Sequence, residues 1–182
     1  SIINLKSLSN PPSVYAENIS VFESGAHTGE IAASMLKNIA SGTLVGHSER
    51  RFTLNETFQD INLKLERAIN AGLQITLCVG SKNQDSLAHQ EEVYGQLSSA
   101  LVKFDSRTSK LLSIAYEPVY AIGTGLVPEG DFLEDQLNLI QQVLQDNGLE
   151  VPVLYGGSVD PTNTSKIMEL GFKGLLAGTV GL

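Results

Sequence analysis

The chain has 182 residues, of which 42% are hydrophobic and 18% charged, which is enough apolar material for one core in a single domain, residues 1–182. Its formal net charge of -8 leaves no broad basic surface for a nucleic-acid backbone, and no apolar run approaches the ~18 residues of a membrane span. These features exclude disordered and fibrous classes, and we expect a soluble, cytoplasmic protein that binds neither nucleic acid nor a membrane.

Short apolar segments alternate with longer segments of helical period from about residue 43 onward, a pattern typical of parallel βα units. Each short segment is nearly continuous in apolar or small residues, as expected when both faces of a parallel sheet are covered. The predicted strands are residues 43–45, 75–79, 112–116, 153–155 and 174–177.

Helices are predicted between these strands from apolar stripes and from the glycines that can end them. The first stripe runs from Phe58 to Ile69 before Gly72, and the second comprises Leu87, Tyr94, Leu97 and Leu101. The third runs from Leu133 to Leu144 before Gly148, and Asp131 and Glu134 resemble a capping box for its helix. The fourth comprises Ile167 and Leu170 before Gly171.

The segments that follow the predicted strands carry most of the chemistry. They are residues 46–51 (GHSERR), 117–125 (EPVYAIGTG) and 156–158 (GGS), together with Gly178. In parallel α/β folds ligands bind at the carboxyl ends of the strands, where the next helix points its N-terminus at the site. One face of the sheet should therefore gather all the candidates.

Each of these residues also has a plainer interpretation. Glu117 ends an apolar strand and Pro118 follows, so its carboxylate either lies in a poorly hydrated pocket, where its basicity rises, or forms a surface ion pair. His47 after a strand is by itself more typical of a structural histidine, and Gly-Gly-Ser of a simple turn. Segment 123–125 lacks the third glycine of a dinucleotide fingerprint.

No disulfide or metal site is predicted, because Cys78 is the single cysteine and the three histidines are well separated. We therefore expect no metal, and the incomplete dinucleotide fingerprint at 123–125 leads us to expect no cofactor.

Taken in order, these motifs resemble the triosephosphate isomerase family. Residues 46–51 match its GHSERR, residues 116–125 its YEPVWAIGTG with Tyr120 in place of Trp, and residues 155–159 its YGGSV. Residues 25–30 are similar to the GAFTGE of its dimer loop, and residues 4–6 look like its NWK. The resemblance implies a cytoplasmic aldose–ketose isomerase of glycolysis and gluconeogenesis, which interconverts dihydroxyacetone phosphate and glyceraldehyde 3-phosphate through an enediol.

The resemblance also implies a role for each site residue. Glu117 would be the base and His47 a neutral hydrogen-bond donor to the substrate carbonyl. Lys6 would stabilise the negative charge of the enediolate, and Asn4 would orient Lys6 or contact a substrate oxygen. Segment 118–125 would close as a lid that excludes water. The substrate phosphate would be held by Gly123, Gly156, Gly157, Ser158 and Gly178.

The chain departs from the family in ways that bear on its architecture. A (β/α)8 barrel typically needs about 250 residues, so we expect an incomplete barrel of about six core parallel strands. The link between residues 6 and 14 is too short for a parallel crossover, which predicts an irregular extended segment over 14–21 beside a gap. The gap would expose strand edges and apolar side chains of the barrel wall. Their burial favours a homo-oligomer, dimer or higher, formed through residues 25–30 and the gap.

Smaller departures affect the site and its scaffold. Ser81 stands where the family usually carries Glu, and Thr179 follows Gly178 where the family has a second glycine. Arg50 and Glu30 look like an ion pair supporting the dimer loop, whereas Arg51 and Glu56 are interpreted as scaffold or solvated ion-pair residues. The alternative function is a non-catalytic or weakly active barrel remnant that serves as a phosphate-binding or structural subunit.

Overall fold

One parallel sheet organises the chain in the computed structural model, which describes residues 11–178. Its strands lie side by side in sequence order, and every neighbouring pair is parallel. The strands are β1 (Tyr15–Ala16), β2 (Gly42–Val45), β3 (Gln74–Val79), β4 (Leu112–Tyr116) and β5 (Val153–Tyr155). The expected parallel α/β arrangement is therefore confirmed.

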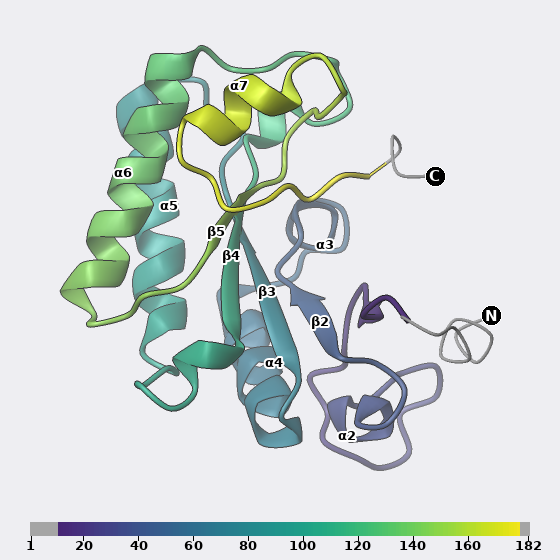
Figure 1. Ribbon diagram of the computed structural model, residues 1–182. Coiled ribbons are helices and arrows are strands. Elements are labelled where there is room, and N and C mark those ends of the chain that lie inside the picture. The colour runs from purple at the N-terminus through teal and green to yellow at the C-terminus, as the bar shows by residue number, and fades with distance from the viewer. Residues whose placement is uncertain (1–10, 179–182) are drawn as a thin grey trace.

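Three long helices cover one face of this sheet, and Figure 1 shows them along one side of β3, β4 and β5. They are α4 (Phe58–Ala71), α5 (Ser86–Leu101) and α6 (Gly130–Asp146). The shorter elements are α2 (Ala33–Leu36), α3 (Ser48–Phe52), α7 (Thr164–Glu169) and the 3-10 turns η1 (Ser109–Leu111) and η2 (Val119–Ala121). No helix within residues 11–178 is long and apolar enough to cross a membrane.

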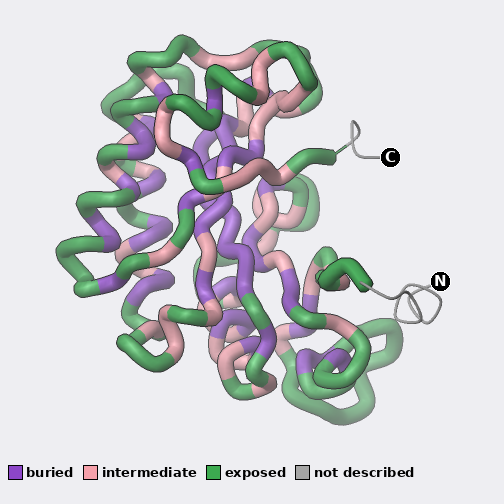
Figure 2. Tube along the Cα trace, in the orientation of Figure 1, coloured by how far each residue is buried: buried purple, intermediate pink, exposed green. Residues whose placement is uncertain are grey.

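The core lies between the sheet and these helices, where Figure 2 shows the buried trace concentrated in the strands. Ile75, Leu77 and Ile114 are almost completely buried there, and burying each such side chain contributes about 1.5–3 kcal/mol. Helix α4 ends as its sequence predicts, because Gly72 adopts the left-handed conformation, and at its start Thr57 and Asp60 form a capping box that was not predicted from the sequence.

The segment at 174–177 does not form the sixth strand that the sequence predicts. It makes one isolated parallel bridge, between Tyr155 and Leu175. The flanking hydrogen bonds run from Tyr155 N to Gly174 O and from Leu176 N to Tyr155 O. The sheet therefore has five strands within the described residues, with a single bridge continuing it beyond β5.

At the other edge, residues 14–21 are not wholly irregular as expected, because Tyr15–Ala16 forms β1 and pairs with Gly42 and Thr43 of β2. A Cβ on Gly42 would lie 2.4 Å from the Tyr15 ring, so the glycine makes room for this close pairing. The predicted strand at residues 2–6 lies outside the described residues.

Two helix predictions also need correction. In α5, Leu87 and Tyr94 are exposed, and the buried face includes His89 and Gln96. The pattern failed there because polar side chains occupy core positions. Helix α6 begins at Gly130 after Glu129 without a side-chain cap, so the capping box predicted from Asp131 and Glu134 is absent.

The face of the sheet opposite the helices lines an open cavity of about 530 Å³. Leu44, Thr76, Ser113, Leu154 and Leu176 contribute to its wall. In a complete barrel this face would be enclosed; the predicted gap beside residues 14–21 remains a prediction.

Candidate active site

Glu117 follows β4 directly and is completely buried. The Ser48 N–H, in the first turn of α3, donates to Glu117 Oε2 over 2.9 Å. The other carboxylate oxygen, Oε1, receives no well-oriented hydrogen bond from the described residues. The side chain is thus anchored by a well-oriented hydrogen bond at one oxygen only.

His47 precedes the same short helix and faces this carboxylate. Its Nδ1 accepts a hydrogen bond from Glu49 N at 3.4 Å, which places the ring hydrogen of the neutral form on Nε2. Nε2 lies 3.0 Å from Glu117 Oε1, and the His47 side chain is 27% exposed. A proton acceptor and a hydrogen-bond donor therefore share one site, with the donor reaching the surface.

Arg51 is part of this site, a role that the sequence interpretation missed. It donates from Nε to Gly46 O and from Nη1 to Gly80 O, each over 2.8 Å. Its Nη2 lies 3.5 Å from Glu117 Oε2, and its side chain is 6% exposed. The signal available in the sequence was its spacing from His47, since four residues on a helix return to the same face.

The environment of Glu117 sets its basicity. Burial is the largest influence and raises the pKa of Glu117 above its usual 4.5, because the charged form loses water. His47, Arg51 and the Ser48 hydrogen bonds oppose the shift because they favour the carboxylate. A raised pKa makes the carboxylate a stronger base, and this is the direction of shift that general-base catalysis requires.

This shift predicts the acid side of the pH profile. If Glu117 is the base, kcat/KM should fall as the pH drops through a pKa above 4.5, and Arg51→Met should move that limb higher by removing a nearby positive charge. The raised pKa also means that this carboxyl favours folding while protonated, a contribution lost as the pH rises through that pKa. If kcat/KM falls only at or below pH 4.5 in both the wild type and Arg51→Met, Glu117 is not the base.

The glycines after β5 mainly leave space in the site, and the backbone N–H of Gly156 is already hydrogen-bonded within the protein. The Gly156 N–H donates to Tyr116 O over 2.8 Å, so it is engaged in the sheet. A Cβ on Gly156 would lie 3.3 Å from Glu117 Cγ, and one on Gly157 would lie 2.2 Å from the Tyr155 hydroxyl. A side chain at 156 would therefore be tight against the carboxylate, and one at 157 would clash with the tyrosine.

The expected lid contacts this loop. Ser158 Oγ donates to Ala121 O over 2.8 Å, which joins the loop after β5 to segment 118–125. Gly123 has φ of +70°, a conformation that suits glycine, and no side chain crowds it. Gly178 is exposed at the end of the described chain. Phosphate binding by Gly123, Ser158 and Gly178 remains a prediction.

The other two predicted catalytic residues, Asn4 and Lys6, lie outside the described residues. Ser81, which replaces the family's usual Glu, is fully buried, and its hydroxyl donates to the Glu92 carboxylate of α5. Ser81 O also accepts from Val119 N over 3.1 Å at the start of η2. A carboxylate supplied eleven residues later in the chain therefore stands near the substituted position.

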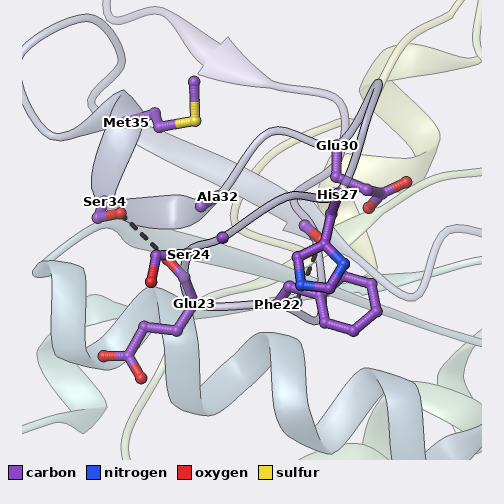
Figure 3. A pocket seen from close by; sticks show the side chains of 10 residues that line it. Phe22, Glu23, Ser24, His27, Glu30, Ala32, Ser34 and Met35 are labelled. Atoms are coloured by element: carbon purple, nitrogen blue, oxygen red, sulfur yellow. Dashed lines mark hydrogen bonds between the residues drawn. The ribbon is translucent and has the colours of Figure 1, made fainter.

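The segment predicted as a dimer loop, residues 25–30, is exposed and borders a cavity of about 140 Å³. Figure 3 shows the His27 ring lying against Phe22, and the two rings are stacked with centroids 3.5 Å apart. Arg50 pairs with Glu56 and not with Glu30 as expected, and Lys64 contacts the same carboxylate. Arg50 and Glu56 are therefore scaffold residues beneath this loop.

No group of three or more His, Cys, Asp or Glu side chains within residues 11–178 is arranged to hold a metal ion.

Comparison with known proteins gives consistent matches along the chain. A family model described as triosephosphate isomerase matches residues 2–182. The triosephosphate isomerase of Bradyrhizobium sp. (strain ORS 278) is 40% identical over 177 residues, covering 93% of this chain and 70% of the relative. That of Trichodesmium erythraeum is 41% identical over 156 residues, with coverage of 84% and 63%. That of Nostoc sp. is 40% identical over 171 residues, with coverage of 92% and 69%. The chain thus spans 63–70% of the length of these relatives.

Proposed function

The chain belongs to the triosephosphate isomerase family, and on that premise we propose that it interconverts dihydroxyacetone phosphate and glyceraldehyde 3-phosphate by proton transfer through an enediol. Glu117 removes the proton from the carbon beside the carbonyl. His47 donates its Nε2 hydrogen to the carbonyl oxygen as negative charge develops there. The relatives carry the name of this activity, which supports the proposal.

The observation that carries the proposal is the 3.0 Å separation of His47 Nε2 and Glu117 Oε1 at the carboxyl ends of β2 and β4. A triose is small enough for both groups to reach adjacent carbon and oxygen atoms. Lys6 and Asn4 supply charge stabilisation and orientation, and segment 118–125 with Ser158 and Gly178 encloses the phosphate. No cofactor takes part in this proposal.

An assay that couples formation of dihydroxyacetone phosphate from glyceraldehyde 3-phosphate to a second enzyme tests the function directly. We expect turnover by the wild-type chain. Lys6→Ala should lower kcat/KM by about 10²–10³. The reason is that one lost electrostatic donor removes about 2.7–4 kcal/mol of transition-state stabilisation. Lys166→Ala, in α7, is the control and should retain activity.

The alternative, a phosphate-binding or structural subunit without turnover, is separated by the same experiment. It predicts that a phosphate-bearing analogue of the enediolate raises the melting temperature while no isomerisation occurs. Nothing in the site favours this alternative over catalysis.

We also propose a cytoplasmic homo-oligomer, dimer or higher. Phe22, Ile31 and Met35 are exposed hydrophobic side chains around the 25–30 loop, and the open inner face of the sheet adds apolar wall. Size-exclusion chromatography with light scattering should give at least twice the 19.5 kDa chain mass, and Met35→Glu should shift the protein toward monomer. A stable wild-type monomer would contradict this.

A further inference from the structure

His89, in the first turn of α5, is completely buried and has both ring nitrogens engaged. Nδ1 lies 2.8 Å from Asn83 O, and Nε2 lies 2.9 Å from the Tyr116 hydroxyl. A carbonyl oxygen only accepts, so Nδ1 carries the hydrogen and Nε2 accepts from Tyr116. Burial lowers the pKa of His89, which favours this neutral form. The orientation of the ring is therefore fixed from two sides.

The fixed ring lies among side chains from both ends of the expected lid. Tyr120, in η2, meets it edge-on with centroids 6.1 Å apart, and Phe132, in the first turn of α6, does so at 5.3 Å. Tyr120 and Phe132 also contact each other edge-on, at 6.2 Å. Edge-to-face pairs of this kind contribute beyond their buried area. His89 thus joins the segment entering the lid to the helix that follows it.

The same ring is tied to the residue next to the base, because Tyr116 immediately precedes Glu117. A further contact supports the same hinge: Ser81 O, in the loop before α5, accepts from Val119 N over 3.1 Å. The start of the lid is therefore supported from the loop before α5 and from the first turn of that helix.

We propose that His89 is a positioning residue for the lid, acting through Tyr120 to hold the hinge at residues 118–121 in the geometry from which segment 118–125 closes. The inference rests on the proposed function. Lid closure matters because an exposed enediolate can break its C–O bond to phosphate, which leaves with the bonding electron pair. The resulting enol tautomerises to methylglyoxal, so triose phosphate yields methylglyoxal and inorganic phosphate without an oxidant. Poor hinge geometry should therefore divert turnovers into phosphate release.

The test compares wild type, His89→Ala, Tyr120→Leu and the double variant, with Leu87→Ala as a control because Leu87 lies on the same helix and is 66% exposed. For each, isomerisation and the fraction of turnovers ending in phosphate release are measured. We expect both single variants to lower kcat more than they change KM and to raise the released fraction severalfold. Because His89 acts through Tyr120, the double variant should be no worse than the worse single variant. The inference would be overturned if the effects of the two substitutions multiply in the double variant. It would also be overturned if His89→Ala releases phosphate in the same fraction of turnovers as the wild type.

Two further variants keep the test decisive if His89→Ala does not fold. His89→Phe retains a ring against Tyr120 and Phe132 but loses both hydrogen bonds, whereas His89→Gln retains an acceptor for Tyr116 but loses the ring. The ring is the support, so His89→Phe should stay closer to the wild-type released fraction than His89→Gln. The reverse order would contradict the proposal.

Amide hydrogen exchange separates this inference from the proposed function, because it does not need turnover. Exchange at residues 119–122 should be faster in His89→Gln than in Leu87→Ala. Absence of isomerisation in the wild type, with that difference present, would refute the proposed function and leave His89 as the hinge support. Equal exchange in the two variants would refute the role of His89 whatever the activity of the wild type.

Discussion

Glu117→Gln is expected to lower kcat by about 10²–10⁴, the contribution of a positioned general base, while KM changes little. The amide matches the carboxylate in size and can still accept from Ser48 N, which now donates to Glu117 Oε2 over 2.9 Å. It has no basic lone pair to receive a carbon-bound proton. The loss should therefore appear in the chemical step, as measured by the coupled isomerase assay.

Two companion variants make this result specific. Glu117→Asp keeps the charge but withdraws it by one methylene, and a displacement of about 1 Å can cost ~10²-fold in rate. Glu91→Gln changes an exposed carboxylate of α5 and should leave kcat unaltered. Because Gln leaves the buried Arg51 without its counter-charge, thermal melting must accompany the kinetics. A folded Glu117→Gln protein with wild-type turnover would remove Glu117 from the mechanism.

The sequence predicted that Glu117 and His47 would lie at the same edge of the sheet, because both follow nearly continuous apolar segments typical of parallel strands. Strands β4 and β5 have the predicted bounds, and Gly72 ends α4 as expected. Parallel strands place their carboxyl ends at one edge, so residues 70 positions apart in sequence meet there. The meeting of Glu117 with His47 follows from that topology alone.

The buried face of α5 and the partner of Ser81 were not predicted correctly for one physical reason. In both cases polar side chains are buried in the core and form hydrogen bonds there. The apolar stripe predicted for α5 was right at its C-terminal end, where two leucines are buried, but wrong at Leu87 and Tyr94. His89 and Gln96 occupy buried positions instead and bind backbone groups there. The partnership of Ser81 with Glu92 has no spacing signature, since it depends on how α5 returns along β3. Such contacts are set by tertiary packing.

Edge strands were harder to predict for a different reason. Among residues 11–178, segments 15–16 and 174–177 pair with a single neighbour each, so few hydrogen bonds decide whether a strand forms. Tyr15 pairs because Gly42 leaves space for its ring. The segment beyond β5 makes only the bridge at Leu175.

Gly80→Ala is expected to cause the largest loss of stability among single-atom additions near the site, together with loss of isomerase activity. A Cβ there would lie 1.8 Å from the backbone oxygen of Glu117, and φ of +153° disfavours any side chain. Gln96 holds Gly80 by hydrogen bonds to its N–H and carbonyl, of 2.8 Å and 3.0 Å, so the residue cannot simply move aside. Relief of the clash requires the ends of β3 and β4 to separate, which displaces the base.

Chemical denaturation should show destabilisation of about 3 kcal/mol or more, in the range where backbone strain and core disruption combine. Gly72→Ala is the matched control, because Gly72 also has positive φ, at +70°, but a Cβ there meets nothing within 4 Å. It should lose only about 1–2 kcal/mol, the cost of left-handed backbone for a residue with a Cβ, and keep full activity. The close approach and the more strained φ distinguish Gly80 from Gly72, so equal losses in both variants would mean that the contact between Gly80 and the Glu117 backbone does not hold Glu117 in place.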